Sequence, residues 1–153
     1  MTCKVSDFGL ARDVMNIRVY ERGSDGNLPL RWMALESITD DVYTTMSDVW
    51  SYGVLLWEIV TLGTRPYPAM SAKMMIGEVQ RGYRMPKPMH CQEELYGIML
   101  RCWEEEPEKR PTFTTISDEL YGLMHVGKEC ILIKDFEETE YEVTLPKDER
   151  EKI

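Results

Sequence analysis

The sequence has few cysteines and histidines, and their spacing does not suit a zinc site. The cysteines are Cys3, Cys91, Cys102 and Cys130, and the only histidines are His90 and His125. No C-x-x-C pair occurs, whereas structural zinc sites need four such ligands at short, regular spacings. His90–Cys91 is the one adjacent pair, and we do not expect it to bind metal. We expect all four cysteines to be reduced, as in the cytosol.

An excess of basic residues and long hydrophobic runs are also missing. The chain of 153 residues has 18 Lys and Arg against 27 Asp and Glu, a net charge of −9. This balance argues against a nucleic-acid partner and against binding to anionic membranes. The most apolar stretch, residues 54–62, contains Glu58 and is shorter than the roughly 20 residues of a membrane span. The start of the chain is too polar for a signal peptide, so we expect a soluble segment.

What the chain does contain predicts a mainly α domain. Residues 1–44 are rich in Gly, Pro, Asp and Arg without a helical period, which predicts a long ordered loop of the kind that carries function. Residues 48–62 are apolar on almost every side, with Thr45 or Ser47 as a cap and Gly63 as the stop. A helix that is apolar all round is expected to be central and buried.

Three further helices are expected, over 71–82 with Ser71 as its cap, over 92–105, and from about Thr114. Four methionines of these three helices are expected to fill the core: Met74, Met75, Met99 and Met124. Residues 128–153 hold nine acidic and five basic side chains, net −4. We favour a loosely ordered tail there over a hairpin of the β-like runs 131–133 and 141–145.

Several motifs in a fixed order resemble the activation segment and C-terminal lobe of a protein kinase. They are Asp7-Phe8-Gly9, Pro29-Leu30-Arg31-Trp32-Met33, Ala34-Leu35-Glu36, Ser47-Asp48-Val49-Trp50-Ser51-Tyr52-Gly53 and Glu104-x-x-Pro107-x-x-Arg110-Pro111. The likeness covers about residues 4–124. The Pro-hydrophobic-basic-Trp-Met run is typical of tyrosine kinases, and the neighbouring motifs are similar to the fibroblast-growth-factor and Ret-type receptors. Leu35 departs from the usual proline.

The resemblance implies a kinase-like C-terminal lobe over 1–126, with an activation segment over 7–36 and a helical body over 45–126, followed by an acidic tail over 127–153. It implies ATP and Mg²⁺ as cofactors, protein tyrosines as substrates, and a dimeric single-pass receptor that places this region on the cytoplasmic side of the plasma membrane. No G-x-G-x-x-G and no H-R-D occurs in the chain. We therefore expect a partial sequence that is inactive alone. A truncated non-catalytic binding module and a pseudokinase remain alternatives.

Individual site residues follow from the resemblance alone. Asp7 matches the Mg²⁺-binding aspartate, with Phe8 and Gly9 beside it at the nucleotide. Tyr20 matches an activating phosphotyrosine, whose phosphate Arg12 or other arginines of the loop, Arg18, Arg22 and Arg31, would hold. The expected substrate platform consists of Leu28, Pro29, Leu30 and Trp32.

The remaining assignments concern support of the lobe and the tail. Glu36 and Arg110 match a pair of residues that form an ion pair across the lobe. Asp48 matches a buried aspartate whose usual donors are absent here, so we expect it to be unsatisfied or wet. Leu55 and Ile59 resemble the stack beneath the adenine, although simple core packing describes them equally well. Tyr141, in an acidic run, is either part of a solvated tail or a docking site for phosphotyrosine-reading adaptor domains.

Overall fold

The computed structural model describes residue 4, residue 6 and residues 28–125, and the regular elements of this part are helices, as the sequence predicts. The elements are α1 (Leu35–Thr39), α2 (Thr45–Val60), α3 (Ala72–Gln80), α4 (Glu93–Cys102), the 3₁₀ helix η2 (Pro107–Lys109) and α5 (Phe113–His125). Of the expected activation segment over 7–36, residues 7–27 lie outside the described residues, as does the expected tail over 127–153.

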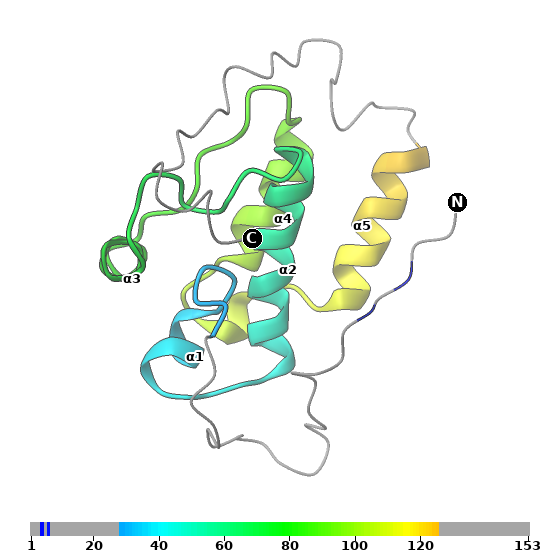
Figure 1. Ribbon diagram of the computed structural model, residues 1–153. Coiled ribbons are helices and arrows are strands. Elements are labelled where there is room, and N and C mark those ends of the chain that lie inside the picture. The colour runs from blue at the N-terminus through cyan, green and yellow to red at the C-terminus, as the bar shows by residue number, and fades with distance from the viewer. Residues whose placement is uncertain (1–3, 5, 7–27, 126–153) are drawn as a thin grey trace.

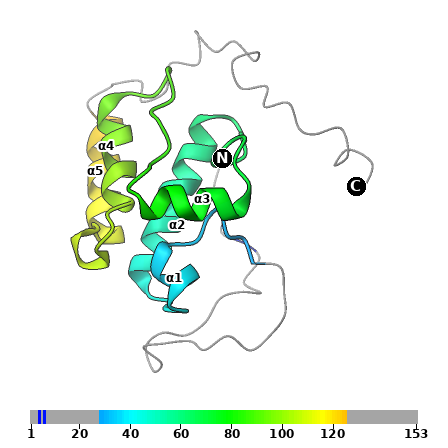
Figure 2. The same cartoon turned by 90° about the vertical axis from the view of Figure 1, so that its left-hand side faces the viewer.

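Helix α2 is the central element of the described part. It lies beside α4, which runs in the opposite direction, and α5 packs on α4 (Figure 1). Helix α3 crosses in front of α2 when the molecule is turned (Figure 2). One hydrophobic core joins these elements, and its largest fully buried side chains include Trp50, Trp103, Tyr67, Met85, Ile98 and Met99.

The start of α2 is fixed by a reciprocal cap. The Thr44 hydroxyl accepts hydrogen bonds from the backbone N–H groups of Met46, at 3.1 Å, and Ser47, at 3.3 Å. The Ser47 hydroxyl in turn accepts from the Thr44 N–H at 3.1 Å, so both residues satisfy donors that a helix start leaves free. The cap is therefore Thr44, one residue before the predicted Thr45, and the other predicted residue, Ser47, completes the cap from the third position of the helix. The helix ends at Val60, and Gly63 follows with a φ of +95°.

One side of α2 is open, which corrects the expectation of a helix buried all round. Leu55 is 43% exposed and Ile59 is 53% exposed, and Leu62 beyond the helix is exposed too. Val49, Val54 and the other inward-facing residues are buried against α4 and its neighbours. Simple core packing of Leu55 and Ile59 is thus wrong for the described residues, because no described element covers that face.

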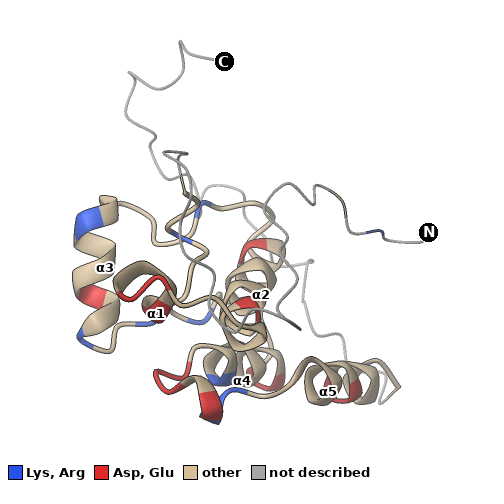
Figure 3. Ribbon diagram, turned by 90° about the horizontal axis from the view of Figure 1, so that it is seen from below, with Lys and Arg blue, Asp and Glu red and all other residues tan. Residues whose placement is uncertain are grey.

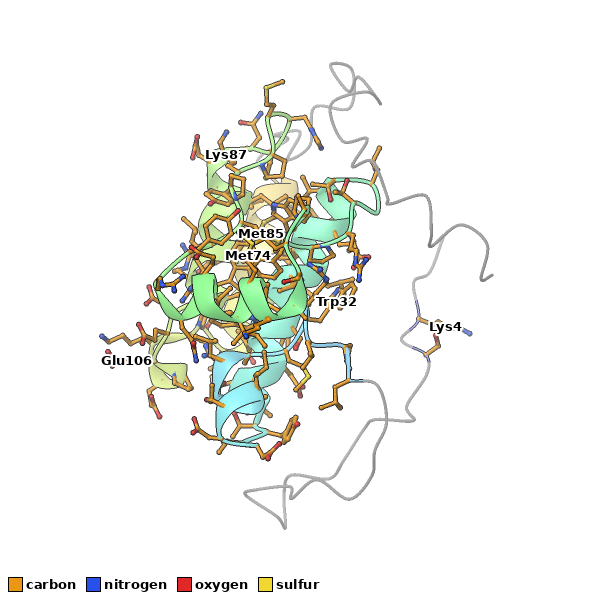
Figure 4. All side chains as sticks on the ribbon, turned by 60° about the vertical axis from the view of Figure 1, so that its left-hand side comes forward. Lys4, Trp32, Met74, Met85, Lys87 and Glu106 are labelled. Atoms are coloured by element: carbon orange, nitrogen blue, oxygen red, sulfur yellow. The ribbon has the colours of Figure 1, made fainter. Side chains whose placement is uncertain are left out.

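Three smaller differences have local causes. Residues 35–39 form α1, a short helix that lacks a side-chain cap and has no periodic pattern long enough to predict. Helix α4 ends at Cys102 instead of continuing to Glu105. Met75 and Met99 are buried as expected, but Met74 and Met124 are exposed, because each lies on the outer side of its helix. Figure 4 shows Met74 on α3.

Gly53 is the point where α2 comes closest to the end of α4. A Cβ atom at this position would lie 2.7 Å from the Cβ of Cys102 and 2.7 Å from Nε1 of Trp103. Both neighbours are fully buried and cannot move aside easily. The absence of a side chain at Gly53 therefore sets how tightly α2 and α4 pack.

We expect Gly53→Ala to lower the free energy of unfolding by about 1–3 kcal/mol, because the added methyl group overpacks this contact. Urea denaturation of the chain measures the change. Gly97→Ala on α4 is the matched control, since its Cβ would meet only the end of Arg101 at 3.7 Å. It should stabilise by about 0.5–1 kcal/mol. Equal stability of the two variants would contradict this account of Gly53.

Candidate functional site

The four residues of the expected substrate platform lie on one compact turn before α1. The Trp32 N–H donates to the Pro29 carbonyl at 2.9 Å, and the Leu30 N–H donates to the Leu28 carbonyl at 2.8 Å. Pro29 is exposed at the tip, while Leu28, Leu30 and Trp32 are half-buried. The turn therefore presents a short apolar surface whose shape is set by its own backbone hydrogen bonds.

Arg31 ties this turn to the loop between α2 and α3. Its guanidinium donates to the carbonyls of Pro66, at 2.8 Å, and Tyr67, at 2.9 Å, and also to the carbonyl of Met70. The sequence pattern suggested Arg31 as a partner for a phosphate on Tyr20. The structure shows three bonds from Arg31 to main-chain carbonyls, whereas Tyr20 lies outside the described residues, so the pairing with its phosphate stays a prediction. Three carbonyls converging on one side chain have no signature in sequence spacing.

Trp32 fixes the other edge of the turn. Its indole Nε1 donates to Oε2 of Glu58 on α2 at 3.0 Å, and Figure 4 labels Trp32 beside that helix. The platform thus has two attachments, one to α2 through Trp32 and one to the α2–α3 loop through Arg31. A surface held at two points keeps its position relative to the helical body.

The structure joins Glu36 and Arg110, which the resemblance paired although they lie 74 positions apart. Arg110 Nη1 donates to Glu36 Oε1 at 2.6 Å and Nη2 donates to Oε2 at 3.0 Å. The side chain of Arg110 has no exposed surface and that of Glu36 is 15% exposed. The hydroxyl of Ser47 also donates to Glu36 Oε1 at 3.2 Å. This bidentate pair is therefore a buried, charge-assisted contact.

The other donors of Arg110 are satisfied by backbone. Nε donates to the Glu104 carbonyl at 2.8 Å, Nη1 to the Met46 carbonyl at 3.0 Å and Nη2 to the Glu105 carbonyl at 3.3 Å. The acidic turn between α4 and η2 is red in Figure 3. Arg110 thereby connects α1, the start of α2 and the turn after α4 through one side chain.

Two guanidiniums lie over the ring of Trp50 inside the lobe. The central carbons of Arg84 and Arg110 are 4.8 Å and 5.1 Å from the ring centroid. Arg84 also donates to the carbonyl of Trp103 at 2.7 Å. Burial lowers the pKa of Arg84, and nearby Tyr67 opposes that shift. Contacts between cations and the face of a tryptophan favour this arrangement.

The pKa of Glu36 reflects a competition. Burial alone would raise it, but the hydrogen bond from Arg110, those from the backbone and Ser47, and the positive charge of Arg110 outweigh burial. The pKa of the carboxyl group is therefore below its usual value of 4.5 in the folded chain. A depressed pKa means that ionised Glu36 stabilises the fold at neutral pH.

Asp48 is exposed in the first turn of α2, and its carboxyl group has no hydrogen-bond or ion-pair partner among the described residues, although its backbone N–H donates to the Thr44 carbonyl at 3.2 Å. Partial burial raises the pKa of this carboxyl group. The prediction that Asp48 is unsatisfied or wet because its usual donors are absent stays a prediction.

The other predicted site residues fall outside the described residues. They are Asp7, Phe8, Gly9, Arg12, Tyr20 and Tyr141.

In the described part of the chain, no group of three or more His, Cys, Asp and Glu side chains could hold a metal ion. Ring atom Nε2 of buried His90 lies 2.5 Å from the Val60 carbonyl. Among the described helices, none combines the length and the apolar character required to cross a membrane.

We expect Glu36→Gln to lower the free energy of unfolding at pH 7 by about 3 kcal/mol, because the buried guanidinium loses its counter-charge. Since the folded pKa of Glu36 is depressed, the carboxylate's contribution is complete above 4.5 and disappears as the pH falls through the lower folded value. The difference between wild type and variant should therefore shrink towards acidic pH. Denaturant unfolding at several pH values tests this.

Glu106→Gln is the matched control, because Glu106 pairs with Lys109 at the surface, where both side chains are more than half exposed. It should change stability little at any pH. A pH-independent loss in Glu36→Gln would argue against the electrostatic role of the pair.

Comparison with known proteins agrees with this geometry. Residues 1–120 match the profile of the protein tyrosine and serine/threonine kinase family. The chain is 49% identical to the tyrosine kinase receptor Cad96Ca of Drosophila melanogaster over 140 residues. The matched region covers 92% of this chain and 18% of that receptor. It is 49% identical to the tyrosine-protein kinase receptor torso of Bombyx mori, covering 81% of this chain and 15% of that receptor.

The fibroblast growth factor receptor of Hydra vulgaris is 48% identical over 79% of this chain and 15% of its own length. The chain thus spans less than a fifth of each of these three receptors. The chain therefore belongs to the protein tyrosine and serine/threonine kinase family, and it is a portion of a kinase domain that includes the helical C-terminal lobe.

Proposed function

We propose that the chain is the C-terminal part of the catalytic domain of a receptor protein-tyrosine kinase. The complete enzyme transfers the γ-phosphoryl group of ATP to tyrosine hydroxyls of protein substrates. The observation that carries this proposal is the platform turn, which Arg31 and Trp32 fix to the helical body. The printed names of the relatives, which are tyrosine kinase receptors, support the tyrosine specificity and the receptor context.

In the proposed reaction the substrate phenol oxygen forms a bond to the γ-phosphorus as the bond to the β,γ-bridging oxygen breaks. ADP leaves and the phenolic proton is released. Such transfer depends mainly on positioning and on stabilising charge. The platform contributes positioning, because a peptide lying against Leu28, Pro29 and Leu30 would be held at a fixed distance from the nucleotide.

Asp7 is the residue of this chain that we propose as a ligand of Mg²⁺. Its carboxylate supplies the hard oxygen donors that Mg²⁺ prefers, and the bound ion would bridge and neutralise phosphate oxygens. Phe8 and Gly9 would lie beside it. These residues come from the sequence resemblance, and a nucleotide-binding part of the domain would have to supply the remaining contacts to ATP.

Two tyrosines are proposed to regulate the enzyme and its partners. Phosphorylated Tyr20 would order the activation segment through arginines of its own loop, Arg12 first among them. Phosphorylated Tyr141 would meet only like charge in its acidic run, and would stay accessible to phosphotyrosine-reading adaptor domains. As in a dimeric single-pass receptor, this region would work on the cytoplasmic side of the plasma membrane.

A chimaera tests the proposed activity. Residues 1–153 are joined to the preceding part of the Cad96Ca kinase domain, and phosphorylation of a tyrosine peptide is measured with radiolabelled ATP. We expect activity in the chimaera and none in the 153-residue chain alone. Asp7→Asn in the chimaera should reduce turnover by about a hundredfold or more, because the metal and the phosphates lose their alignment.

Asp40→Asn serves as the control, since Asp40 is an exposed carboxyl group just after α1. It should leave turnover unchanged. A well-folded chimaera without activity would instead favour the alternative of a non-catalytic binding module or a pseudokinase.

Substitutions of the two tyrosines should have different effects in the same chimaera. We expect Tyr20→Phe to lower turnover, because the activation segment loses the phosphate that orders it. Tyr141→Phe should leave turnover intact and abolish capture of the phosphorylated chimaera by a phosphotyrosine-reading domain. Peptide phosphorylation and pull-down measure the two effects. Slower catalysis in Tyr141→Phe would show that this division is wrong.

A further inference from the structure

One tyrosine of the described part differs from the rest in its exposure. The structure describes six of the chain's eight tyrosines. Tyr121 on α5 is 64% exposed, whereas Tyr67 is buried and the others are half-buried. The half-buried ones are Tyr43, Tyr52, Tyr83 and Tyr96. A kinase could therefore reach the hydroxyl of Tyr121 with less disturbance of the core than any other in this part.

The other described tyrosines are engaged in the fold. The hydroxyl of Tyr96 donates to the Met85 carbonyl at 2.9 Å, and the ring of Tyr52 lies 5.7 Å from that of Phe113. The hydroxyl of Tyr121 has no hydrogen-bond partner among the described residues. Its ring lies on the imidazole of His125, one turn further along α5, with 3.9 Å between centroids. Moving Tyr121 from this place would lose that ring contact and the contact of 2.8 Å between Nδ1 of His125 and the Tyr121 carbonyl, both of them within the last turn.

The turn that carries Tyr121 is the last of α5, and its sequence weakens it. Gly122 follows directly, and glycine is the least favourable residue in a helix after proline. A Cβ atom at Gly122 would meet nothing within 4 Å, so no close packing requires a glycine there. Of the residues beyond it, half-buried Leu123 packs against the core, while Met124 and His125 are exposed. Unwinding from Tyr121 onward would therefore release one partly buried side chain.

The helix before this turn is better anchored. Ile116 is buried, and Glu119 forms an ion pair with Arg101 of α4. Asp118 and Glu119 also place acidic residues three and two positions before Tyr121, and charge patterns of this kind contribute to substrate choice by kinases. The start of α5 can thus stay docked while its last turn opens.

We propose that Tyr121 is a phosphorylation site for a protein-tyrosine kinase, presented by unwinding of the last turn of α5. The phenol oxygen forms a bond to the γ-phosphorus of ATP, the β,γ-bridging bond breaks, ADP leaves and the phenolic proton goes to solvent. The chain acts here as the substrate, so the inference does not depend on its own proposed activity.

Phosphorylation also has a structural consequence. The new phosphate would carry about −1.5 to −2 charges at the negative end of the helix dipole, where negative charge is unfavourable. It would therefore keep the last turn unwound, while Ile116 and the Glu119–Arg101 pair hold the rest of α5. The modified chain would differ from the unmodified one only near this terminus.

The experiment uses the whole 153-residue chain. It is incubated with an added active tyrosine kinase domain and Mg-ATP, and phosphorylated residues are mapped by mass spectrometry over time. We expect phosphate on Tyr121 well before any appears on Tyr67 or Tyr96, and none at position 121 in Tyr121→Phe. Hydrogen exchange of the phosphorylated chain should show lost protection confined to the backbone of residues 121–125.

Two results would overturn the proposal. The first is an unmodified Tyr121 while the kinase phosphorylates a control peptide in the same tube. The second is modification of Tyr121 at the same rate as Tyr67 and Tyr96, which would mean that the kinase acts on an unfolded chain. A ready modification of Tyr121 ahead of these two supports it.

Gly122→Ala tests the unwinding step, because alanine strengthens the last turn without a clash. The rate of phosphorylation at Tyr121 should fall about fourfold, the ratio that corresponds to the helix preference of alanine over glycine. Gly97→Ala makes the same change on α4 and should leave this rate unchanged. Equal rates at Tyr121 in wild type and Gly122→Ala would contradict presentation by unwinding.

Discussion

The described lobe depends most on the requirement to satisfy one buried guanidinium. Arg110 has no exposed surface, so its charge and all its donors must find partners inside the protein. The carboxylate of Glu36 and three backbone carbonyls supply them, and these come from α1, the start of α2 and the turn after α4. Elements distant in sequence are held in one arrangement because no other arrangement would satisfy this side chain.

Much of the helical fold follows from local sequence signals. Ser71 caps α3 as predicted, and its hydroxyl accepts a hydrogen bond from the Met74 N–H at 3.2 Å. The apolar run of α2 is helical, but hydrophobicity alone could not show that Leu55 and Ile59 are exposed. Burial depends on which element covers a face, and that information is not contained in the helix itself. For the same reason, helical spacing placed Met74 on the wrong side of α3.

The candidate site, like the fold, was only partly predictable from the sequence. The family resemblance, and not any spacing in this sequence, paired Glu36 with Arg110 and grouped the platform residues. It could not reveal that Arg31 binds the carbonyls of the α2–α3 loop. Main-chain carbonyls look alike at every position, and their convergence arises only when the loop folds back. Residues 66–70 therefore support the platform without any side-chain motif that would identify them.

The contact between α2 and α4 also determines the chemical reactivity of Cys102. Cys102 is fully buried with its Cβ against Gly53, and burial raises the pKa of its thiol to about 12. Only the thiolate attacks electrophiles, so this sulfur is inert to alkylating reagents and oxidants while the two helices stay together. Its modification consequently reports opening of the lobe. We therefore expect the rate of its oxidation to follow how often the lobe opens.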